Sequence, residues 1–296
     1  MKPSAPRLTA ALCTSALSVA LLAVAPTPAA ARSAASVEPV ALGQARIAKR
    51  GKRRQLKHAR HRRAIKARAA RQPATPVETP GVRFRGDFEA GFDPWHVQSL
   101  SYRATLLPSG AYQGTQAARF EVDPGDVEPE TGSQRSEVSG PTFSEGEDLY
   151  IRDAIRVPSG NTYEGPWQIV QQLHEEDWNG SPGVAVFLDE GRTLTIGPGD
   201  SSRTFWTSRP LQENRWYDLV YRVKLSQDPS VGFVEVWLDG VPQTLEDGQT
   251  KIYAQTLQTD ATYLKAGIYR SKSSTGTSIV EHDAIVVGDS YAAATS

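Results

Sequence analysis

The chain has 296 residues and a formal net charge of zero, and its one cysteine, Cys13, lies in an apolar stretch near the N-terminus. Beyond that residue the chain cannot use disulfides or a cysteine-based metal site, so its stability must come from a hydrophobic core. The zero charge is the sum of a basic segment and an acidic one.

Residues 1–31 have the features of a secretory signal. Lys2 and Arg7 precede an uncharged apolar stretch over Leu8–Ala25, and three alanines at 29–31 form a small-residue cleavage site. Two prolines shortly before the cut argue against the alternative, a transmembrane anchor. We therefore expect a cleaved signal peptide, a secreted protein and no membrane span.

Residues 32–80 form a basic arm that ends in a Pro-rich linker. Between Arg46 and Arg71 there are 13 Lys or Arg residues and no acidic residue. Specific nucleic-acid binding would need aromatic residues or a folded groove, which this block lacks. We predict a disordered spacer, or a tether to anionic surfaces, with no specific nucleic-acid partner.

Residues 81–296 carry 17 Lys plus Arg against 31 Asp plus Glu, a net charge of −14. Short runs of alternating polarity, separated by turn residues, predict one all-β domain with two antiparallel sheets packed face to face. No helical periodicity is sustained, and we expect a monomer. The predicted strands include Glu147–Val157, Trp167–His174, Val184–Leu188, Thr193–Ile196, Trp216–Leu225, Phe233–Leu238, Tyr263–Arg270 and Val280–Val287.

Three predicted strands each carry a polar row on one face, because alternate side chains of a strand point to opposite sides. In the predicted strand Trp167–His174, Ile169 and Leu173 should face the core, opposite the polar row. Each row alone is typical of a solvent-facing sheet, and an Arg–Glu pair is typical of a surface ion pair. The rows are Gln168, Gln172 and His174; Tyr263, Lys265 and Tyr269; and Arg135 with Glu137.

Together the three rows could catalyse β-elimination on a uronic acid. The C5 proton beside a carboxylate is a poor acid, so donors such as Arg135 and Gln172 must first neutralise the carboxylate. A base then takes the C5 proton and an acid protonates the O4 leaving group, with His174 and Tyr269 as candidates. Lys265 would help to hold the anionic sugar. The chemistry requires no metal or other cofactor.

The same motifs resemble those of a known group of enzymes. Arg-Ser-Glu-Val at 135–138, Gln-Leu-His at 172–174 and Tyr-Leu-Lys-Ala-Gly-Ile-Tyr at 263–269 resemble the signature strands of jelly-roll alginate lyases. The wider context, including Trp-Tyr-Asp at 216–218 and Val-Trp-Leu-Asp-Gly at 236–240, is similar to the group of heparin lyase I and glucuronan lyase. The likeness spans about Arg83 to Gly288.

The resemblance implies a β-jelly roll, a concanavalin-like antiparallel sandwich, with a concave substrate cleft. It assigns catalysis to Arg135, Gln172, His174 and Tyr269. We expect Glu137, Tyr263 and Lys265 on the same polar rows to bind substrate. Alginate lyases usually carry Gln where this chain has Ser271, which favours a glucuronan-like polymer over alginate and leaves heparin-like polymers open. In β-1,4-glucuronate the C5 hydrogen and O4 share one side of the ring, so Tyr269 alone could be base and acid. An iduronate or guluronate substrate would need His174 as base.

Four further residues are candidates for substrate binding. Arg152 and Arg156 share a face of one strand and could bind flanking uronates, although an exposed edge explains them equally well. Trp178 and Asn179 follow the strand of Gln172 and could line the cleft as a sugar-stacking loop.

Three carboxylates at the two ends of the domain form a candidate metal site. Asp87 and Glu89 open the domain, and Asp283 lies on the last predicted strand. In sandwiches that resemble this one, such carboxylates meet at a structural Ca²⁺ with oxygen ligands. Capping or surface charge is the alternative.

Two other classes share the predicted fold. A carbohydrate-binding module would not need the set Arg135, Gln172, His174 and Tyr269. A jelly-roll glycoside hydrolase needs two spaced carboxylates, and the adjacent Glu175 and Glu176 do not form the usual pattern. We therefore predict a polysaccharide lyase that acts on an anionic, uronic-acid-containing polymer.

Overall fold

A computed structural model describes residues 79–176 and 180–296. The chain divides into two units, Met1–Ala64 and Ile65–Ser296, and every described residue belongs to the second. The predicted signal peptide and nearly all of the basic arm lie outside the described residues. Within the described part, no helix is long and apolar enough to cross a membrane.

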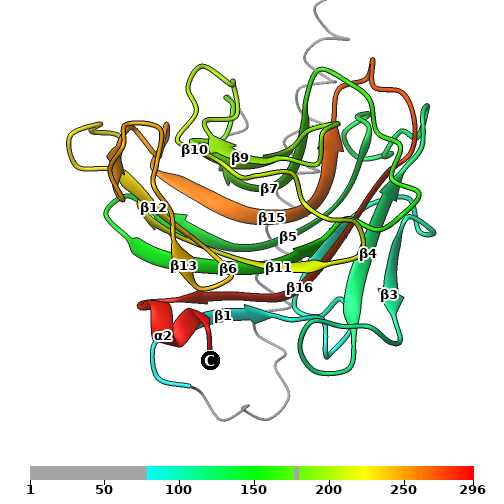
Figure 1. Cartoon of the computed structure of the whole chain (residues 1–296), viewed down its shortest axis with the longest axis horizontal. Coiled ribbons are helices and arrows are strands. Elements are labelled where there is room, and N and C mark those ends of the chain that lie inside the picture. Colours follow the sequence, from blue (N-terminus) through cyan, green and yellow to red (C-terminus); the bar gives the residue numbers. More distant parts are fainter. Residues whose placement is uncertain (1–78, 177–179) are drawn as a thin grey trace, which may run out of the picture. The chain divides into compact units, whose positions relative to one another are not determined.

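The described strands form two antiparallel sheets, as the alternating sequence runs predicted (Figure 1). Sheet A has nine strands: seven follow the order β13-β12-β11-β6-β16-β4-β3, β1 pairs with β16, and β14 pairs with β12. Their bounds are β1 Val82–Gly86, β3 Ala104–Leu107, β4 Ala117–Val122, β6 Asp148–Arg156, β11 Trp216–Lys224, β12 Phe233–Leu238, β13 Val241–Pro242, β14 Ile252–Tyr253 and β16 Ser278–Gly288.

Sheet B has seven strands in the order β10-β9-β8-β7-β15-β5-β2. Strands distant in sequence are neighbours here, since β15 lies between β7 and β5, which is the crossover pattern of a jelly roll. A short helix, α2 (Tyr291–Ala294), follows the last strand. The bounds in sheet B are β2 His96–Gln98, β5 Arg135–Ser144, β7 Gln168–Glu175, β8 Val184–Leu188, β9 Leu194–Gly197, β10 Trp206–Thr207 and β15 Ala261–Arg270.

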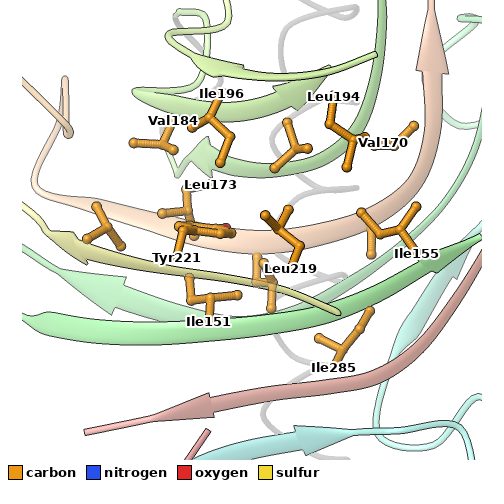
Figure 2. Packing of buried hydrophobic residues seen from close by; sticks show 14 of the residues in the cluster. Ile151, Ile155, Val170, Leu173, Val184, Leu194, Ile196, Leu219, Tyr221 and Ile285 are labelled. Carbon is orange, nitrogen blue, oxygen red and sulfur yellow. The ribbon is translucent and has the colours of Figure 1, made fainter. Parts of the chain in front are cut away.

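Apolar side chains of the two sheets meet between them and form the hydrophobic core (Figure 2). On β6 the alternation is regular: Ile151 and Ile155 are fully buried in the core, while Arg152 and Arg156 point to the other face. Burial of each such aliphatic side chain contributes about 1.5–3 kcal/mol. The core therefore provides the stability that cysteine pairing cannot.

One polar contact crosses the core and ties the two sheets together. Asp153 on β6 accepts a hydrogen bond from Gln171 Nε2 on β7 at 2.7 Å, and both of its oxygens lie 2.9 Å from His282 Nδ1 on β16. All three side chains are fully buried. Burial raises the pKa of Asp153, and His282 opposes this by favouring the carboxylate. Gln171 precedes Gln172, so this contact lies directly beneath the strand that carries a candidate catalytic residue.

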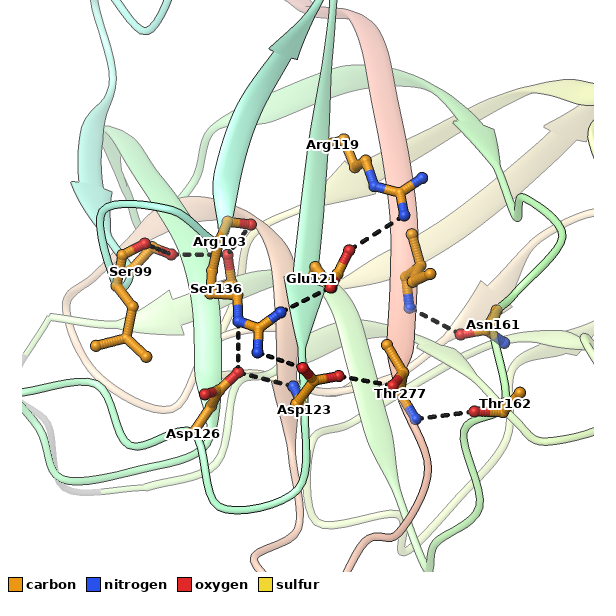
Figure 3. A network of polar contacts seen from close by, with 12 residues as sticks. Ser99, Arg103, Arg119, Glu121, Asp123, Asp126, Ser136, Asn161, Thr162 and Thr277 are labelled. Carbon is orange, nitrogen blue, oxygen red and sulfur yellow. Dashed lines mark hydrogen bonds and ion pairs between the residues drawn. The ribbon is translucent and has the colours of Figure 1, made fainter.

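A second polar network anchors the start of β5 (Figure 3). Arg103 pairs with Glu121 at 2.6 Å, with Asp126 at 2.7 Å and with Asp123. The backbone carbonyl of Arg103 accepts a hydrogen bond from Ser136 Oγ at 3.1 Å. Since Ser136 follows Arg135, the network fixes the strand segment from which Arg135 projects.

Candidate active site

Three adjacent strands of sheet B bring the predicted catalytic residues onto one face. Strand β15 pairs with β7 on one side and with β5 on the other. We call the face of sheet B that points away from the core the site face. Directly opposed pairs across these strands are Tyr263 with His174, Lys265 with Gln172, and Tyr269 with Arg135.

Glu137 is the centre of this group. Its Oε1 accepts a hydrogen bond from Gln172 Nε2 at 2.6 Å, and its Oε2 lies 2.6 Å from Lys265 Nζ and 3.1 Å from Arg135 Nη1. All four side chains are buried, with at most 6% of their surface exposed. One carboxylate thus holds three donors at fixed positions. We call Arg135, Glu137, Gln172 and Lys265 the central cluster.

The charges of the central cluster shift each other's titration. Burial by itself would raise the pKa of Glu137, but Lys265 and Arg135 lie close enough to hold it below its usual value. Burial lowers the pKa of Lys265 to about 8, although Glu137 opposes this change. Near neutral pH the cluster therefore contains two cations and one anion. Its net charge of +1 contrasts with the acidic composition of residues 81–296.

Tyr269 lies at one end of the central cluster. The Arg135 guanidinium sits over its ring, 4.2 Å from the centroid, and the Trp167 ring meets it edge-on at 4.9 Å and 71°. Arg135 Nε also donates to Ser133 Oγ at 2.7 Å. Arginine has five N–H donors, and these contacts use Nε and Nη1. The ion pair with Glu137 and the contact with the Tyr269 ring hold the guanidinium between these two residues.

His174 and Tyr263 lie together at the other end, with ring centroids 5.2 Å apart. His174 Nδ1 lies 2.8 Å from the backbone oxygen of Glu175. A carbonyl oxygen can only accept, so Nδ1 carries the proton and the lone pair of the neutral ring is on Nε2. Burial, with a contribution from Lys265, lowers the pKa of His174 to about 4. The ring is therefore neutral at ordinary pH and able to accept a hydrogen bond or a proton.

The two tyrosines differ in their surroundings. Burial raises the pKa of Tyr263, and the nearby Glu137 raises it further, so the Tyr263 hydroxyl keeps its proton and is not available as a base. Tyr269 is the tyrosine that has a cation, Arg135, against its ring. The predicted partners His174 and Tyr269 are not opposed, because Ile169 is the β7 residue that pairs with Tyr269.

A β-bulge in β7 corrects one predicted row. Regular alternation placed Ile169 with Leu173 in the core. Instead, Val170 joins Leu173 in the core (Figure 2). Ile169 pairs with Tyr269 of the site face. The register of β7 against β8 shifts between residues 169 and 171, and an inserted residue reverses the alternation beyond it. Gln168 therefore does not continue the row of Gln172, and its Nε2 donates to the Leu188 backbone at 3.4 Å.

Gly267 allows β15 to approach β5 closely. Its φ is +124°, and a Cβ at this position would lie 2.3 Å from the backbone oxygen of Ser136. The residue is directly opposite Glu137. A side chain here would push apart the two strands that hold the central cluster.

Arg152 and Arg156 are not part of this site. They lie on β6 of sheet A, on the face that points away from the core. Arg152 pairs with Asp218 at 2.8 Å, and Arg156 pairs with Glu281 and stacks on Trp216 at 4.4 Å. The structure thus does not place these two arginines beside the central cluster, where binding of flanking uronates would require them. Trp178 and Asn179 lie outside the described residues.

The three predicted metal ligands do not fit a calcium site. Asp283 accepts hydrogen bonds from the backbone N–H groups of Tyr112, Gln113 and Ala284. Glu89 accepts three from the backbone and hydroxyl of Thr115 and from the backbone of Gln116. These donors point at the oxygens a cation would need, and no set of three ligand side chains placed for a metal occurs within residues 79–176 and 180–296. Asp87 pairs instead with Arg85 at 3.7 Å.

The sequence did not single out Trp167 or Phe187 as part of the site. Trp167 precedes β7 and contacts Tyr269, while Phe187 on β8 is directly opposite Ile169. Both are half-buried aromatic side chains beside the polar row. An aromatic residue at a site-face position of a neighbouring strand could have indicated them. The bulge in β7 hides this signal, because it changes which residues of that strand point to the site face.

Comparison with known proteins finds several similar solved structures. An endo-β-1,4-glucuronan lyase from Trichoderma reesei is 18% identical, with a TM-score of 0.53, over 72% of this chain and 98% of that one. A family 7 alginate lyase is 13% identical with a TM-score of 0.43, over 64% and 83% of the two chains. A family 131 glycoside hydrolase domain from Coprinopsis cinerea is 11% identical with a TM-score of 0.47, over 71% and 95%.

The first of these similarities shows the fold, a jelly roll. No curated protein matches the chain. A family model described as polysaccharide lyase matches residues 87–286, which is more than half of the chain and includes every strand of the site. The chain therefore belongs to the polysaccharide lyase family.

Proposed function

We propose that this polysaccharide lyase cleaves a uronic-acid-containing polymer, with a glucuronan-like chain as its preferred substrate, by β-elimination on the site face of sheet B. The observation that carries the proposal is the central cluster. A buried group with a net charge of +1 suits a substrate that brings one carboxylate per sugar. Preorganised donors of this kind stabilise the charge that grows on the carboxylate as the C5 proton leaves.

Each residue of the site has a role in this scheme. Arg135 and Gln172 bind the uronate carboxylate, while Glu137, itself paired with Lys265, holds these two donors in place. Glu137 and Lys265, expected from the sequence to bind substrate, act on the sugar through these two donors in this scheme.

The proton transfer is assigned to Tyr269. Its oxygen takes the C5 proton while its own hydroxyl proton passes to O4. The C5–H electron pair forms the C4=C5 double bond, the C4–O4 bond breaks, and the Tyr269 hydroxyl is restored. One residue can do both because the C5 hydrogen and O4 lie on one side of glucuronate. The guanidinium of Arg135 against the ring supports this choice over Tyr263, whose raised pKa disfavours it as a base.

His174 supports a second route. Its Nε2 lone pair and the neighbouring Tyr263 could act from the opposite side of the ring, as an iduronate or guluronate substrate requires. Heparin-like polymers or alginate would then be substrates. On glucuronate, His174 orients the sugar as a neutral acceptor.

A hydrolytic reaction finds less support in the same residues. Glu175 is fully buried and accepts hydrogen bonds from the backbone of Gly183, Gln258 and Thr259 and from the Thr259 hydroxyl. It anchors two loops and is not available as an acid or nucleophile. Glu137 is likewise committed to three donors.

A product assay tests the proposal. Elimination leaves an unsaturated uronide that absorbs in the near ultraviolet, whereas hydrolysis yields only reducing ends. The protein would be assayed on glucuronan, alginates and heparin, with Tyr269→Phe as the matched control. Absorbing product with glucuronan, lost in the variant, is the expected result. Reducing ends without absorbance would overturn the elimination, and activity on alginate alone would overturn the substrate.

We also propose that the protein is secreted, which rests on the charged, apolar and small-residue parts of 1–31. Expressed with its own N-terminus, it should accumulate outside the cell and begin at Arg32. N-terminal sequencing of the extracellular protein checks this. A chain that retains residues 1–31 would contradict it.

A further inference from the structure

A row of directly opposed residues crosses the site face of sheet B from the central cluster toward β9. The register places Arg135, Tyr269, Ile169, Phe187 and Thr195 side by side on β5, β15, β7, β8 and β9. Adjacent strands are ~4.8 Å apart, so Phe187 lies roughly 10 Å from Tyr269 across the sheet. A polymer that crosses the strands at Tyr269 would thus reach Phe187 within a short length of chain.

A pocket of about 180 Å³ lies at the far end of this row. Trp167, Phe187, Thr195 and Arg203 are among the residues that line it. Trp167 belongs to both places, because its ring also meets Tyr269 edge-on at 4.9 Å. The pocket is smaller than the ~300 Å³ at which sites for drug-sized molecules begin, so it suits one ring rather than a length of chain.

The lining of the pocket suits a sugar ring. Trp167 and Phe187 offer aromatic surface for the apolar C–H face of a pyranose, and Thr195 offers a hydroxyl for hydrogen bonding. Asp189 and Arg203 also line the pocket, and their opposite charges cancel. Binding here should therefore depend on stacking and hydrogen bonds rather than on the substrate's carboxylate, in contrast to the central cluster.

We propose that this pocket is a subsite for a further sugar ring of the polymer, separate from the ring held at Arg135. The inference rests on the proposed function, since it needs a polysaccharide chain at Tyr269. It adds a direction: the polymer crosses the strands of sheet B from β5 toward β9. It also adds a source of affinity that does not depend on charge.

The test is a series of oligouronides of increasing length with two pocket variants. Phe187→Ala removes the stacking surface, and Thr195→Trp fills the pocket. Tyr102→Ala removes an aromatic side chain that is 62% exposed and outside the pocket, and it serves as the control. In each pocket variant the loss of kcat/KM should grow with chain length and reach about 3- to 10-fold, expressed mainly in KM. This range follows from about 0.5–1.5 kcal/mol for an aromatic contact.

A second measurement keeps binding separate from turnover. The affinity for oligouronides would be measured for Tyr269→Phe and for the double variant that also carries Phe187→Ala. The affinity lost through Phe187→Ala should be the same at low and at high salt, because the pocket carries no net charge. Losses that do not depend on chain length, or no loss in either pocket variant, would overturn the subsite. If the unaltered protein releases no unsaturated product from any polyuronate, the proposed function itself fails, which is a different result.

Discussion

Lys265 Nζ lies 2.6 Å from Glu137 Oε2, and at most 2% of either side chain is exposed. Removal of two charges from water is costly, and such a pair stabilises a fold only when its geometry is complete. Here the carboxylate also holds Arg135 and Gln172. In the proposed function, this arrangement keeps the donors for the substrate carboxylate in place before the substrate arrives.

Loss of the Tyr269 hydroxyl should abolish most of the turnover. Tyr269→Phe keeps the ring that packs on Arg135 and Trp167, so the fold should be unchanged. We expect kcat to fall about 10²- to 10⁴-fold, the usual effect of removing a proton-transfer group. Tyr263→Phe should have a smaller effect. The near-ultraviolet absorbance of the product measures both, and near-normal turnover of Tyr269→Phe would refute its role.

Arg135→Ala should lower kcat as well as raise KM. Negative charge grows on the substrate carboxylate in the transition state, so a donor that binds it contributes more there than in the ground state. Steady-state kinetics on glucuronan separates the two effects. A change confined to KM would reduce Arg135 to a docking residue.

Glu137→Gln should destabilise the protein strongly. It leaves the buried cations Arg135 and Lys265 without their common carboxylate, and breaking a buried ion pair costs about 3–5 kcal/mol. Urea unfolding followed by circular dichroism gives the free energy of unfolding. Glu213→Gln is the matched control, because Glu213 pairs with Arg192 on the surface, where a pair contributes only about 0–1 kcal/mol. Equal losses in the two variants would contradict the central role of Glu137.

Activity should be highest between the pKa values of two buried groups. His174, with a pKa of about 4, is neutral above that pH, and Lys265, with a pKa of about 8, is charged below it. Activity should therefore fall as the pH drops toward 4 and as it rises past 8. Lys265→Arg should move the alkaline limit upward, since arginine stays protonated. If the profile of kcat/KM against pH keeps its alkaline limit in this variant, Lys265 is not the group whose titration sets that limit.

The same shift in His174 predicts how stability varies with pH. The unfolded chain, in which histidine has a pKa of about 6.5, binds more protons than the native protein between about pH 4 and 6.5. The contribution of His174 is complete above pH 6.5 and is lost as the pH falls toward 4. As the pH falls through this interval, the urea midpoint of the unaltered protein should approach that of His174→Gln.

The basic arm should be dispensable for chemistry. Deletion of residues 32–78 should leave turnover on short oligouronides unchanged, because the family match begins at residue 87. Binding to polyanionic polymer should weaken, most visibly at low salt, where screening is least. Loss of turnover on short oligomers would show that the arm belongs to the fold or the site.

The two-sheet fold could be read from the sequence because strand alternation is a local property. The polar rows of β5 and β15 were predicted correctly for the same reason: Leu264, Ala266 and Ile268 lie in the core, and Tyr263, Lys265 and Tyr269 lie opposite. The row of β7 was predicted only in part. A bulge depends on pairing with two neighbouring strands, so the chain of β7 alone does not show where the alternation reverses.

The sequence by itself determined the kind of residues available for catalysis and the strands that carry them, since residue type and alternation are local. Only the tertiary structure decided which of those residues meet. It placed Glu137 in contact with Arg135, Gln172 and Lys265, set Tyr263 rather than Tyr269 opposite His174, and put Arg152 and Arg156 on the other sheet. The physical reason is that contacts between strands distant in sequence, such as β5, β7 and β15, depend on sheet order and register, which no single strand encodes.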